Sequence, residues 1–368
     1  MEPLTVGVEE EFLVVERGGG DLVPRSHELY ERARPCLGPE VSLELNRCQI
    51  EIGTPVCTTL DEISSHLSRL RASLDAAAEP LGTAIAAVGS HPFSSWRDQE
   101  VDTTNDRFSR MDDVYQIVAR QQVICGCHVH VGIPDPDLAI SVMNRARPWL
   151  APLLALTANS PFWSGLDSGF DSYRLQVWQR WPTSGMPPEL EDRKEYDSLV
   201  DDLTEVDAIE DATFLYWYMR PSERYDTLEF RIADVCLCVD DAVALAGLVR
   251  ALVWTCAVEA LDGEPAPDLR PEIMESGVWR AARYGLAADL VSPVTTSTEP
   301  AAVVVGELLD FIGEGLRFHG DGELVNRLVD RILAEGNGAS RQRRARAERG
   351  SDADVMSFVI DETQRGPS

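Results

Sequence analysis

The stretch TVGVEEEFLVVE, residues 5–16, carries β-branched and aromatic residues around three consecutive acids, and Gly18 to Gly20 follow it. This composition predicts a β-strand that ends in a turn. Alternate residues of a strand share a face, so Glu9 and Glu11 point the same way and Glu10 points to the other side. Two carboxylates on one face can bind a divalent metal ion, although a strand end in an acidic protein can also simply expose its glutamates.

Acids and histidines also interrupt other predicted strands. Glu51 lies in LELNRCQIEIGT, residues 43–54; His128 and His130 lie in GCHVHVGIP, residues 126–134; Glu229 lies in TLEFR. An ionised carboxylate in a buried strand is costly unless it is paired or bound to a metal. Acids on several strands therefore indicate one shared cation site, whose oxygen ligands and occasional imidazole suit Mg²⁺ or Mn²⁺.

Simpler interpretations of these residues remain open. Glu229 can form a salt bridge with Arg231 on its own face, and a His-Val-His strand can place both imidazoles in a hydrogen-bonded core. A zinc site in CGCHVH, residues 125–130, is disfavoured, because strand alternation puts the two cysteines on one face and the two histidines on the other.

Helical patterns and further strands follow along the chain. Thr59 to Glu62 form a capping-box pattern, and apolar residues at helical spacing continue to Leu74. Other helices are predicted at 138–158, about 240–285 and 300–334, and other strands near 83–89, 214–220 and 227–235. Residues 96–107 are polar and predict a loop. Residues 160–187 are rich in Gly, Pro, Ser and aromatic residues, which is typical of a functional loop.

The chain shows no internal repeat and no clear linker. We therefore expect a single catalytic domain, residues 1–368, of α+β class with antiparallel strands and helices on one face. Its ordered core is expected at about residues 4–335, with an arginine-rich C-terminal segment at 336–368. Gly336 and Gly338 could form a hinge that lets this segment close over a nucleotide, but a solvated basic tail that pairs with the protein's own acids explains it equally well.

The charge balance excludes some classes of partner. The chain has 62 Asp and Glu residues against 33 Lys and Arg residues, a formal net charge of −29, which argues against nucleic acid or an anionic membrane. Lys194 is the only lysine, so a cationic phosphate site would depend on arginine, although codon bias in a GC-rich genome produces the same skew.

The N-terminal sequence, the longest apolar stretch and the cysteines together predict a cytoplasmic protein. The N-terminal sequence MEPLTVGVEEEF has no pattern of a secretory signal. The apolar stretch 242–261 is interrupted by Arg250 and Glu259, which favours a buried helix over a membrane span. The eight cysteines are expected to be reduced core residues without disulfides.

The chain has no Walker loop, GxSxG elbow or GxGxxG motif, so any ATP site is of another kind.

Taken together, the motifs resemble the glutamate–cysteine ligase type 2 family, also called carboxylate-amine ligases. The matching stretches, in family order, are GVEEEF (7–12), QIEIGTPVC (49–57), GCHVHVG (126–132), ANSPFWSGLDSGFDSYR (158–174), WPTSGMP (181–187), WYMRPS (217–222), TLEFRIAD (227–234) and GNGASRQR (336–343). The resemblance implies a glutamine-synthetase-like fold, an antiparallel sheet funnel with helices on its outer face.

The resemblance also implies the site residues. Metal ligands and contacts to ATP phosphates would come from the sheet floor, namely Glu9, Glu11, Glu51, His130 and Glu229, with His128 as a further candidate. Arg220 and Arg231 would be catalytic and face phosphates or the substrate carboxylate. Further candidates for substrate or ATP binding are Arg174, Arg341 and Arg344, the last two as closing contacts.

The activity implied is an ATP-dependent ligation that forms an amide through a γ-glutamyl phosphate. Mg²⁺ or Mn²⁺ would be the cofactor, ATP the co-substrate, and glutamate with an amine such as cysteine the small-molecule substrates; a homodimer is expected. Two alternatives stay open: a guanidino or phosphagen-type kinase on the same fold, and a non-catalytic nucleotide-binding regulator. Formation of an amide product distinguishes a ligase from a kinase.

Overall fold

A seven-stranded antiparallel sheet forms the centre of the computed structural model, which describes residues 1–367. Its strands run in the order β2-β3-β1-β5-β9-β8, and β4 also pairs with β1. The bounds are β1 Val6–Glu16, β2 Val41–Leu43, β3 Gln49–Gly53, β4 Thr83–Ala86, β5 Cys127–Gly132, β8 Met219–Pro221 and β9 Thr227–Phe230. The strands predicted around residues 214–220 and 227–235 are present but shorter.

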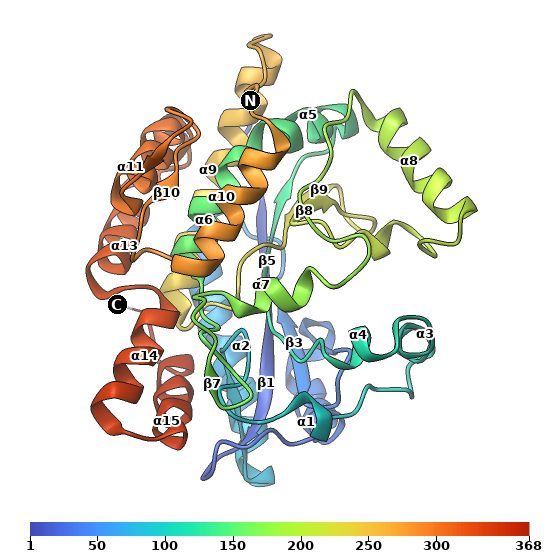
Figure 1. The fold of residues 1–368 in the computed structure, drawn as a ribbon, viewed down its shortest axis with the longest axis vertical. Helices are drawn as coiled ribbons and strands as arrows, with labels where there is room; N and C mark the ends of the chain where they lie inside the picture. The colour runs from blue at the N-terminus through green and yellow to red at the C-terminus, as the bar shows by residue number, and fades with distance from the viewer. Residues whose placement is uncertain (368) are drawn as a thin grey trace.

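The long strand β1 organises this sheet, and it runs through the middle of the molecule in Figure 1. One edge of β1 pairs with β3. Its other edge pairs first with β5, over Val6–Glu10, and then with β4, over Leu13–Glu16. The first half of β1 therefore lies between β3, which carries Glu51, and β5, which carries the His-Val-His motif.

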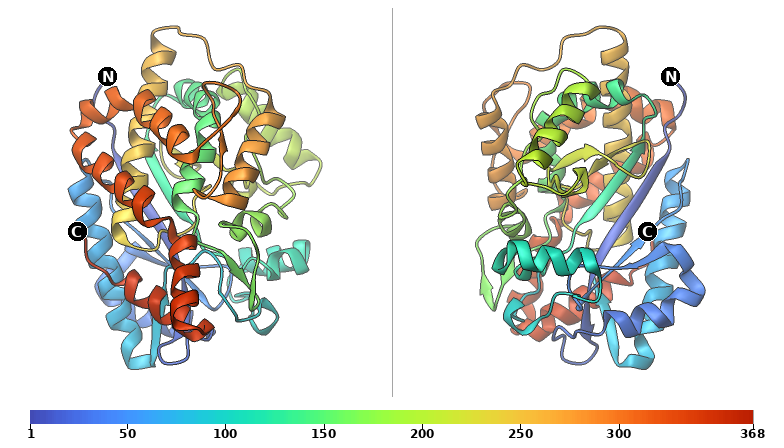
Figure 2. Two further views of the ribbon diagram at one scale, coloured as in Figure 1. Left: turned by 60° about the vertical axis from the view of Figure 1, so that its left-hand side comes forward. Right: turned by 90° about the vertical axis from the view of Figure 1, so that its right-hand side faces the viewer.

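The two faces of the sheet have different surroundings, as the alternation in β1 shows. Val6, Val8 and Glu10 are buried, whereas Gly7, Glu9 and Glu11 are partly accessible. Helices α2 (Leu60–Ala78) and α9 (Val239–Leu261) pack together on the buried face. Figure 2 shows helices on both sides of the sheet, with α2 and α9 together on one of them. The predicted α+β class, an antiparallel sheet with helices packed on its outer face, is confirmed, and shorter helices at residues 106–115 and 173–178 border the accessible face.

Helix α9 is the central helix of the core. It is long and apolar enough to cross a membrane, but 94% of its most apolar window is buried inside the structure. It packs against α5, α12, α13 and the sheet. The prediction of a buried helix over residues 242–261 is therefore confirmed.

The capping box at the start of α2 is also confirmed. The Thr59 hydroxyl accepts a hydrogen bond from the Glu62 amide at 3.2 Å, and the Glu62 carboxylate accepts from the Thr59 amide, also at 3.2 Å. These bonds satisfy amides of the first turn that have no partner within the helix.

The remaining helices surround the sheet and extend the predicted pattern. They are α1 Ser26–Leu37, α3 Asp106–Tyr115, α4 Ile117–Arg120, α5 Pro136–Ala146, α6 Leu150–Thr157, α7 Tyr173–Trp178, α8 Arg193–Glu205, α10 Pro271–Tyr284, α11 Ala301–Phe311, α12 Gly313–His319 and α13 Gly322–Glu335. The predicted helices at 138–158, 240–285 and 300–334 are thus each divided by short breaks. Two small hairpins, β6–β7 (Phe162–Trp163, Leu166–Asp167) and β10–β11 (Leu290–Val291, Thr298–Glu299), complete the fold.

The arginine-rich segment folds into two further helices, α14 (Gly338–Arg349) and α15 (Asp352–Thr363). Helix α15 packs against β4, and its Thr363 hydroxyl accepts a hydrogen bond from the Ala87 amide at 2.9 Å. Both helices lie at the lower left of Figure 1. All eight cysteines are free, and only Cys36 is exposed, which agrees with the expected absence of disulfides.

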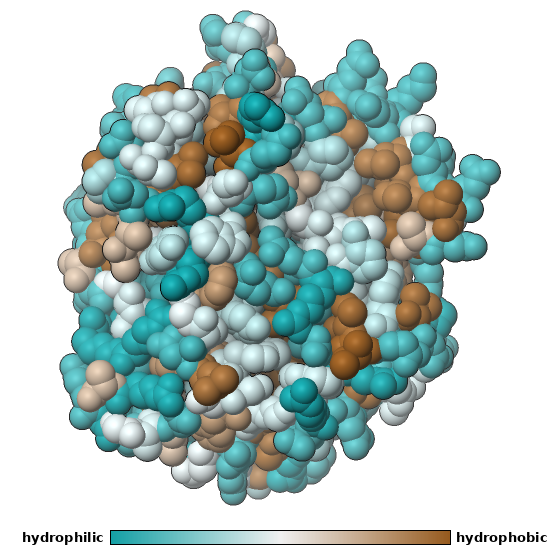
Figure 3. All heavy atoms as spheres, in the orientation of Figure 1, coloured by the Kyte–Doolittle hydropathy of each residue, from teal (hydrophilic) through white to brown (hydrophobic). Residues whose placement is uncertain are grey.

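The surface agrees with the acidic composition. Most of the face in Figure 3 is hydrophilic, and hydrophobic side chains lie between in separate patches.

Glu10 is neutralised inside the core, which separates its role from that of its two neighbours. Its carboxylate accepts two hydrogen bonds from Arg71, at 2.8 Å from Nε and 2.6 Å from Nη2. Both side chains are buried, and Arg71 also donates to the carbonyls of Cys236, Leu237 and Thr363. The pair therefore links β1, α2 and the C-terminus of the chain.

Replacing Arg71 alone by leucine leaves the Glu10 charge buried without a partner, and we expect a loss of about 3–5 kcal/mol in the free energy of unfolding. The double variant Glu10→Leu, Arg71→Leu removes both charges and should recover most of this loss. Urea unfolding of the two variants measures the difference. Equal stability of the single variant and the unaltered protein would contradict the assignment.

Candidate active site

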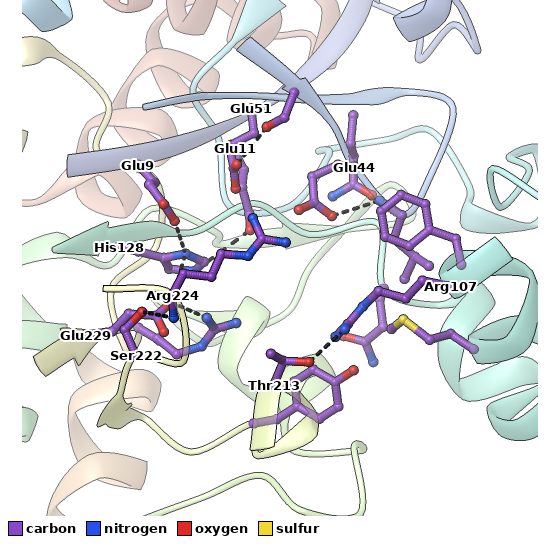
Figure 4. A pocket seen from close by; sticks show the side chains of 18 of the residues that line it. Glu9, Glu11, Glu44, Glu51, Arg107, His128, Thr213, Ser222, Arg224 and Glu229 are labelled. Atoms are coloured by element: carbon purple, nitrogen blue, oxygen red, sulfur yellow. Dashed lines mark hydrogen bonds and ion pairs between the residues drawn. The ribbon is translucent and has the colours of Figure 1, made fainter. Parts of the chain in front are cut away.

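A cavity of about 390 Å³ lies against the accessible face of the sheet. Its floor comes from β1, β3, β5 and β9, and its walls come from α3, α7, the segment 213–216 and the loop between β8 and β9. Figure 4 shows the acids and His128 on the strands, with Arg107 and Thr213 across the cavity from them. All of the predicted metal ligands line this cavity.

Strand register brings these residues together. Glu9 pairs with His128 across β1 and β5, and Glu11 pairs with Glu51 across β1 and β3. His130 pairs with Glu229 across β5 and β9. Residues directly opposite in an antiparallel pair have neighbouring side chains on one face. Six polar residues that lie far apart in the sequence therefore form one surface.

The two histidines lie between the carboxylates. His128 Nδ1 is 3.6 Å from Glu9 and 3.7 Å from Glu229, and its Nε2 is 3.8 Å from Glu11. His130 Nε2 is 3.5 Å from Glu9, and its Nδ1 lies 3.0 Å from the Thr227 hydroxyl. The Nε2 atoms of both rings are buried and have no hydrogen-bond partner in the part of the chain that the structure describes. Such atoms are costly in a folded protein unless they have another function.

A group of three carboxylates forms the second half of the floor. Oxygens of Glu11, Glu44 and Glu51 lie within 4.8 Å of one another. Burial, together with the charge of Glu11, raises the pKa of Glu44 to about 7. Burial, with repulsion from Glu9 and then Glu44, raises the pKa of Glu51 well above its usual range. Among residues 1–367, only Ser42 donates a side-chain hydrogen bond to Glu51, at 2.8 Å, so the group as a whole lacks compensating positive charge.

Arginines compensate Glu229, which lies at the other end of the floor. Arg220 Nε donates to Glu229 at 2.9 Å, and Arg231 Nη1 forms a second ion pair with it. Burial alone would raise the pKa of Glu229, but Arg231 and Arg220 outweigh it and hold that pKa far below its usual range. The salt bridge between Glu229 and Arg231 that the sequence left open is therefore present, beside the histidines.

The two arginines differ in how they are held. Arg220 Nη1 donates to the carbonyls of Thr213 and Leu215 at 2.7 and 2.9 Å, which fixes the wall segment 213–216 to β8. Arg231 stacks on Trp178, with its guanidinium carbon 5.2 Å from the ring centroid, and its Nε is buried without a partner. Arg231 therefore keeps one N–H group that has no acceptor among the described residues.

The donor set fits a divalent cation. Clusters of Glu9, His130 and Glu229, of Glu9, Glu51 and His128, and of Glu11, Glu44 and Glu51 each place their ligand atoms within 4.8 Å of one another. Carboxylate oxygens with a minority of imidazole nitrogens are the donors that magnesium and manganese accept. A cation would also relieve the repulsion among the three carboxylates. Zinc held by the cysteines of residues 125–130 is excluded, because Cys125 and Cys127 are buried in the core, away from this face.

Three of the sequence-predicted residues do not line the cavity. Arg174 is buried in α7, where it donates to the carbonyls of Ile232 and Arg231 at 3.3 Å. Arg341 forms a buried ion pair with Glu362 and lies 3.4 Å from Asp241. Arg344 donates to the Glu335 carbonyl at 3.1 Å. These contacts join α14 to α9, α13 and α15, and the structure does not bring these arginines to the acids of the floor.

Several cavity residues were missed by the sequence reasoning. Glu44 lies between β2 and β3, outside both strands. The sequence pattern placed it within one continuous strand over residues 43–54, where alternation would put it on the opposite face from Glu51. Arg107 belongs to the start of α3, at the end of a segment predicted as a loop. The aromatic wall consists of Trp178 and Trp181, from the predicted functional loop 160–187, and Tyr216, from the strand predicted at 214–220.

Comparison with known proteins identifies the family. The model for glutamate-cysteine ligase family 2 matches residues 5–362. "Putative glutamate–cysteine ligase 2-2" of Frankia alni is 41% identical to this chain, over 98% of this chain and 97% of its own length. "Putative glutamate–cysteine ligase 2" of Rhodopirellula baltica is 38% identical, over 98% and 96% of the two chains.

Solved structures share the fold at low sequence identity. A glutamate–cysteine ligase of Francisella tularensis, solved in complex with AMP, superposes with a TM-score of 0.75 at 14% identity and covers 99% of this chain and 89% of that one. A bifunctional glutathione synthetase of Pasteurella multocida gives a TM-score of 0.73 at 16% identity, over 98% of this chain and 52% of that one.

The acid-floored cavity, the antiparallel sheet and these similarities define an enzyme of the ATP-dependent carboxylate-amine ligase class. The chain belongs to glutamate-cysteine ligase family 2.

The close placement of Glu11, Glu44 and Glu51 predicts that a substitution there changes metal binding. Glu51→Gln should stabilise the metal-free protein by about 1 kcal/mol, because the raised pKa of the Glu51 carboxyl makes it take up a proton on folding at neutral pH, a cost that the neutral amide does not have. The same change should weaken the stabilisation that Mg²⁺ or Mn²⁺ confers. Thermal unfolding with and without the ion measures both effects. Glu205→Gln, an exposed change at the end of α8, is the matched control. An unchanged ion-dependent shift in Glu51→Gln would remove this residue from the metal site.

Proposed function

We propose that this enzyme joins the γ-carboxylate of glutamate to an amine through a γ-glutamyl phosphate, at the expense of ATP. The observation that carries the proposal is the joint placement of Glu9, Glu11, Glu51, His130 and Glu229 in one cavity. Family membership supports a ligase over a phosphagen-type kinase or a non-catalytic regulator. The names of the relatives support glutamate and cysteine as the substrates to test first.

A carboxylate is a poor acyl donor, so it must be activated. Its oxygen attacks the γ-phosphorus of ATP and releases ADP, and the amine then attacks the acyl carbon and releases phosphate. The barrier lies in bringing several anions together, which makes positioning and charge stabilisation the main tasks of the protein.

The acids of the floor would hold Mg²⁺ or Mn²⁺, with Glu11, Glu44 and Glu51 at one end and Glu9, His130 and Glu229 at the other. His128 lies between the two groups. A bound divalent cation supplies charge neutralisation for the phosphate oxygens.

Arg231 lines the cavity beside Glu229, and its buried Nε has no acceptor among the described residues. A donor aimed at developing negative charge in a site shielded from water stabilises the transition state strongly. Arg220 positions Glu229 and the wall segment through its carbonyl contacts. We assign Arg231 to a phosphate or carboxylate oxygen of the substrates.

Glu229→Gln should lower turnover by at least about a hundredfold, because it removes a charged ligand and releases both arginines from their ion pair. Steady-state ligase assays with glutamate, cysteine and ATP measure the loss. Circular dichroism shows whether the variant is folded, and the exposed change Glu205→Gln is again the control. A folded Glu229→Gln enzyme with near-normal turnover would exclude this residue from the site.

The acyl phosphate has its own isotopic test. When the γ-carboxylate of glutamate carries oxygen-18, one labelled oxygen should appear in the released phosphate, because the carboxylate oxygen becomes the bridging atom of the anhydride. Mass spectrometry of the phosphate detects it. Turnover to an amide with unlabelled phosphate would exclude the route, and ADP release without an amide would favour a kinase.

A further inference from the structure

Arg107 differs from the other arginines of the cavity in its partners. Arg220 and Arg231 are both paired with Glu229. No carboxylate of the described residues lies within ion-pair distance of Arg107, which nevertheless lines the same cavity and is only partly exposed. A half-buried guanidinium without a counter-ion is suited to bind an anion that arrives with a ligand.

The structure holds this side chain in one orientation. The Asn105 side chain caps α3 and accepts hydrogen bonds from the amides of Arg107 and Phe108, at 2.9 and 3.4 Å. Arg107 Nη1 donates to the Thr213 hydroxyl at 2.6 Å. Its guanidinium carbon lies 4.3 Å from the centroid of the Phe214 ring. Only one of its five N–H groups has an acceptor among the described residues, so the fork is positioned but not saturated.

Thr213 is itself held in place, since both its amide, at 2.8 Å, and its hydroxyl donate to Asp211. The hydroxyl can therefore accept from Arg107 while it donates to Asp211. This arrangement orients the guanidinium through a neutral group, and the nearest acid of the network, Asp211, is reached only through that hydroxyl. Thr213 is thus a positioning residue for Arg107.

Arg107 and Arg224 lie in different parts of the cavity. In Figure 4, Arg224 extends from the β8–β9 loop toward Glu11, whereas Arg107 lies across the cavity from Glu9 and Glu11. The wall beside Arg107 is aromatic, with Phe108 and Tyr216 among its residues. Phosphates held by a cation belong at the acid floor, so an anion at Arg107 is a different part of the substrates.

We propose that Arg107 binds the α-carboxylate of an amino-acid substrate and so makes the enzyme select amino acids over simple acids or amines. This inference rests on the proposed ligase function. A planar, two-oxygen carboxylate matches the guanidinium fork, and the position of Arg107 across the cavity from Glu9 and Glu11 leaves the reacting end of the substrate beside those acids. The carboxylate can belong to the glutamate donor or to an amino-acid acceptor.

Two pairs of substrates show whether Arg107 binds the carboxylate of the donor or that of the acceptor. Glutamate and 4-aminobutyrate differ only in the α-carboxylate of the donor, and cysteine and cysteamine differ only in that of the acceptor. The unaltered enzyme should favour the carboxylate-bearing member of at least one pair by about tenfold or more in kcat/KM, and Arg107→Met should abolish that preference, mainly by raising KM. The pair whose preference disappears identifies the substrate.

Further variants separate binding from folding. Arg107→Lys keeps the charge without the fork and should give an intermediate preference. Thr213→Val should weaken the same preference and Thr213→Ser should restore it. Arg110→Met is the matched control, because Arg110 lies one turn along α3 and pairs with Glu210 outside this cavity. Unchanged melting temperatures confirm that the variants are folded.

A binding measurement separates this inference from the ligase proposal. Isothermal titration of glutamate and of cysteine, with Mg²⁺ and a non-hydrolysable ATP analogue, should show at least tenfold weaker binding of one amino acid to Arg107→Met. That result without any amide formation would support the inference and contradict the proposed reaction. Unchanged amino-acid binding and unchanged preference for both pairs, or an effect confined to the KM for ATP, would overturn it.

Discussion

The constraint on which the rest of the structure depends is the register of the antiparallel sheet around β1. It sets Glu9 opposite His128, Glu11 opposite Glu51, and His130 opposite Glu229. A shift of one residue in any pairing would move a whole set of side chains to the other face. Burial of Val6 and Val8 against the helices therefore specifies the positions of Glu9 and Glu11 as well.

The same alternation assigns different roles to neighbouring acids. Glu10 is neutralised by Arg71 in the core, whereas Glu9 and Glu11 face the cavity. Charge is unevenly distributed across the floor: Glu229 has two arginine partners, and the group of Glu11, Glu44 and Glu51 has none of comparable strength. A fold that keeps like charges this close gains stability from a bound cation, so the fold and the metal-dependent chemistry depend on the same residues.

Much of this floor could be predicted from the sequence, because a period of two in a strand determines which residues share a face. That rule placed Glu9 with Glu11, set Glu10 apart, and separated the cysteines from the histidines of residues 125–130. It could not find Glu44 or Arg107, which reach the cavity from a bend and from the first turn of a helix. Positions of this kind depend on how distant segments pack, which local periodicity does not encode.

The C-terminal arginines show a second limit of sequence reasoning. Their density and the nearby glycines predicted a closing segment, but charge density carries no information about partners. In the structure Arg341 is held between Asp241 and Glu362, and Asn337 caps α14 through a hydrogen bond from the Ser340 amide at 3.0 Å. A run of arginines after glycines is therefore compatible with a helix that packs on the core through buried ion pairs, as well as with a segment that closes over a nucleotide.

The most direct test of the account is the position of a divalent cation in a crystal of this protein grown with Mn²⁺ and an ATP analogue. Anomalous diffraction locates manganese independently of the protein model. We predict at least one strong peak at coordination distance, about 2.2 Å, from carboxylate oxygens of Glu11 and Glu51. Manganese found only outside the cavity, or an ordered nucleotide bound away from the acids of the sheet, would show that these acids do not form the metal and ATP site.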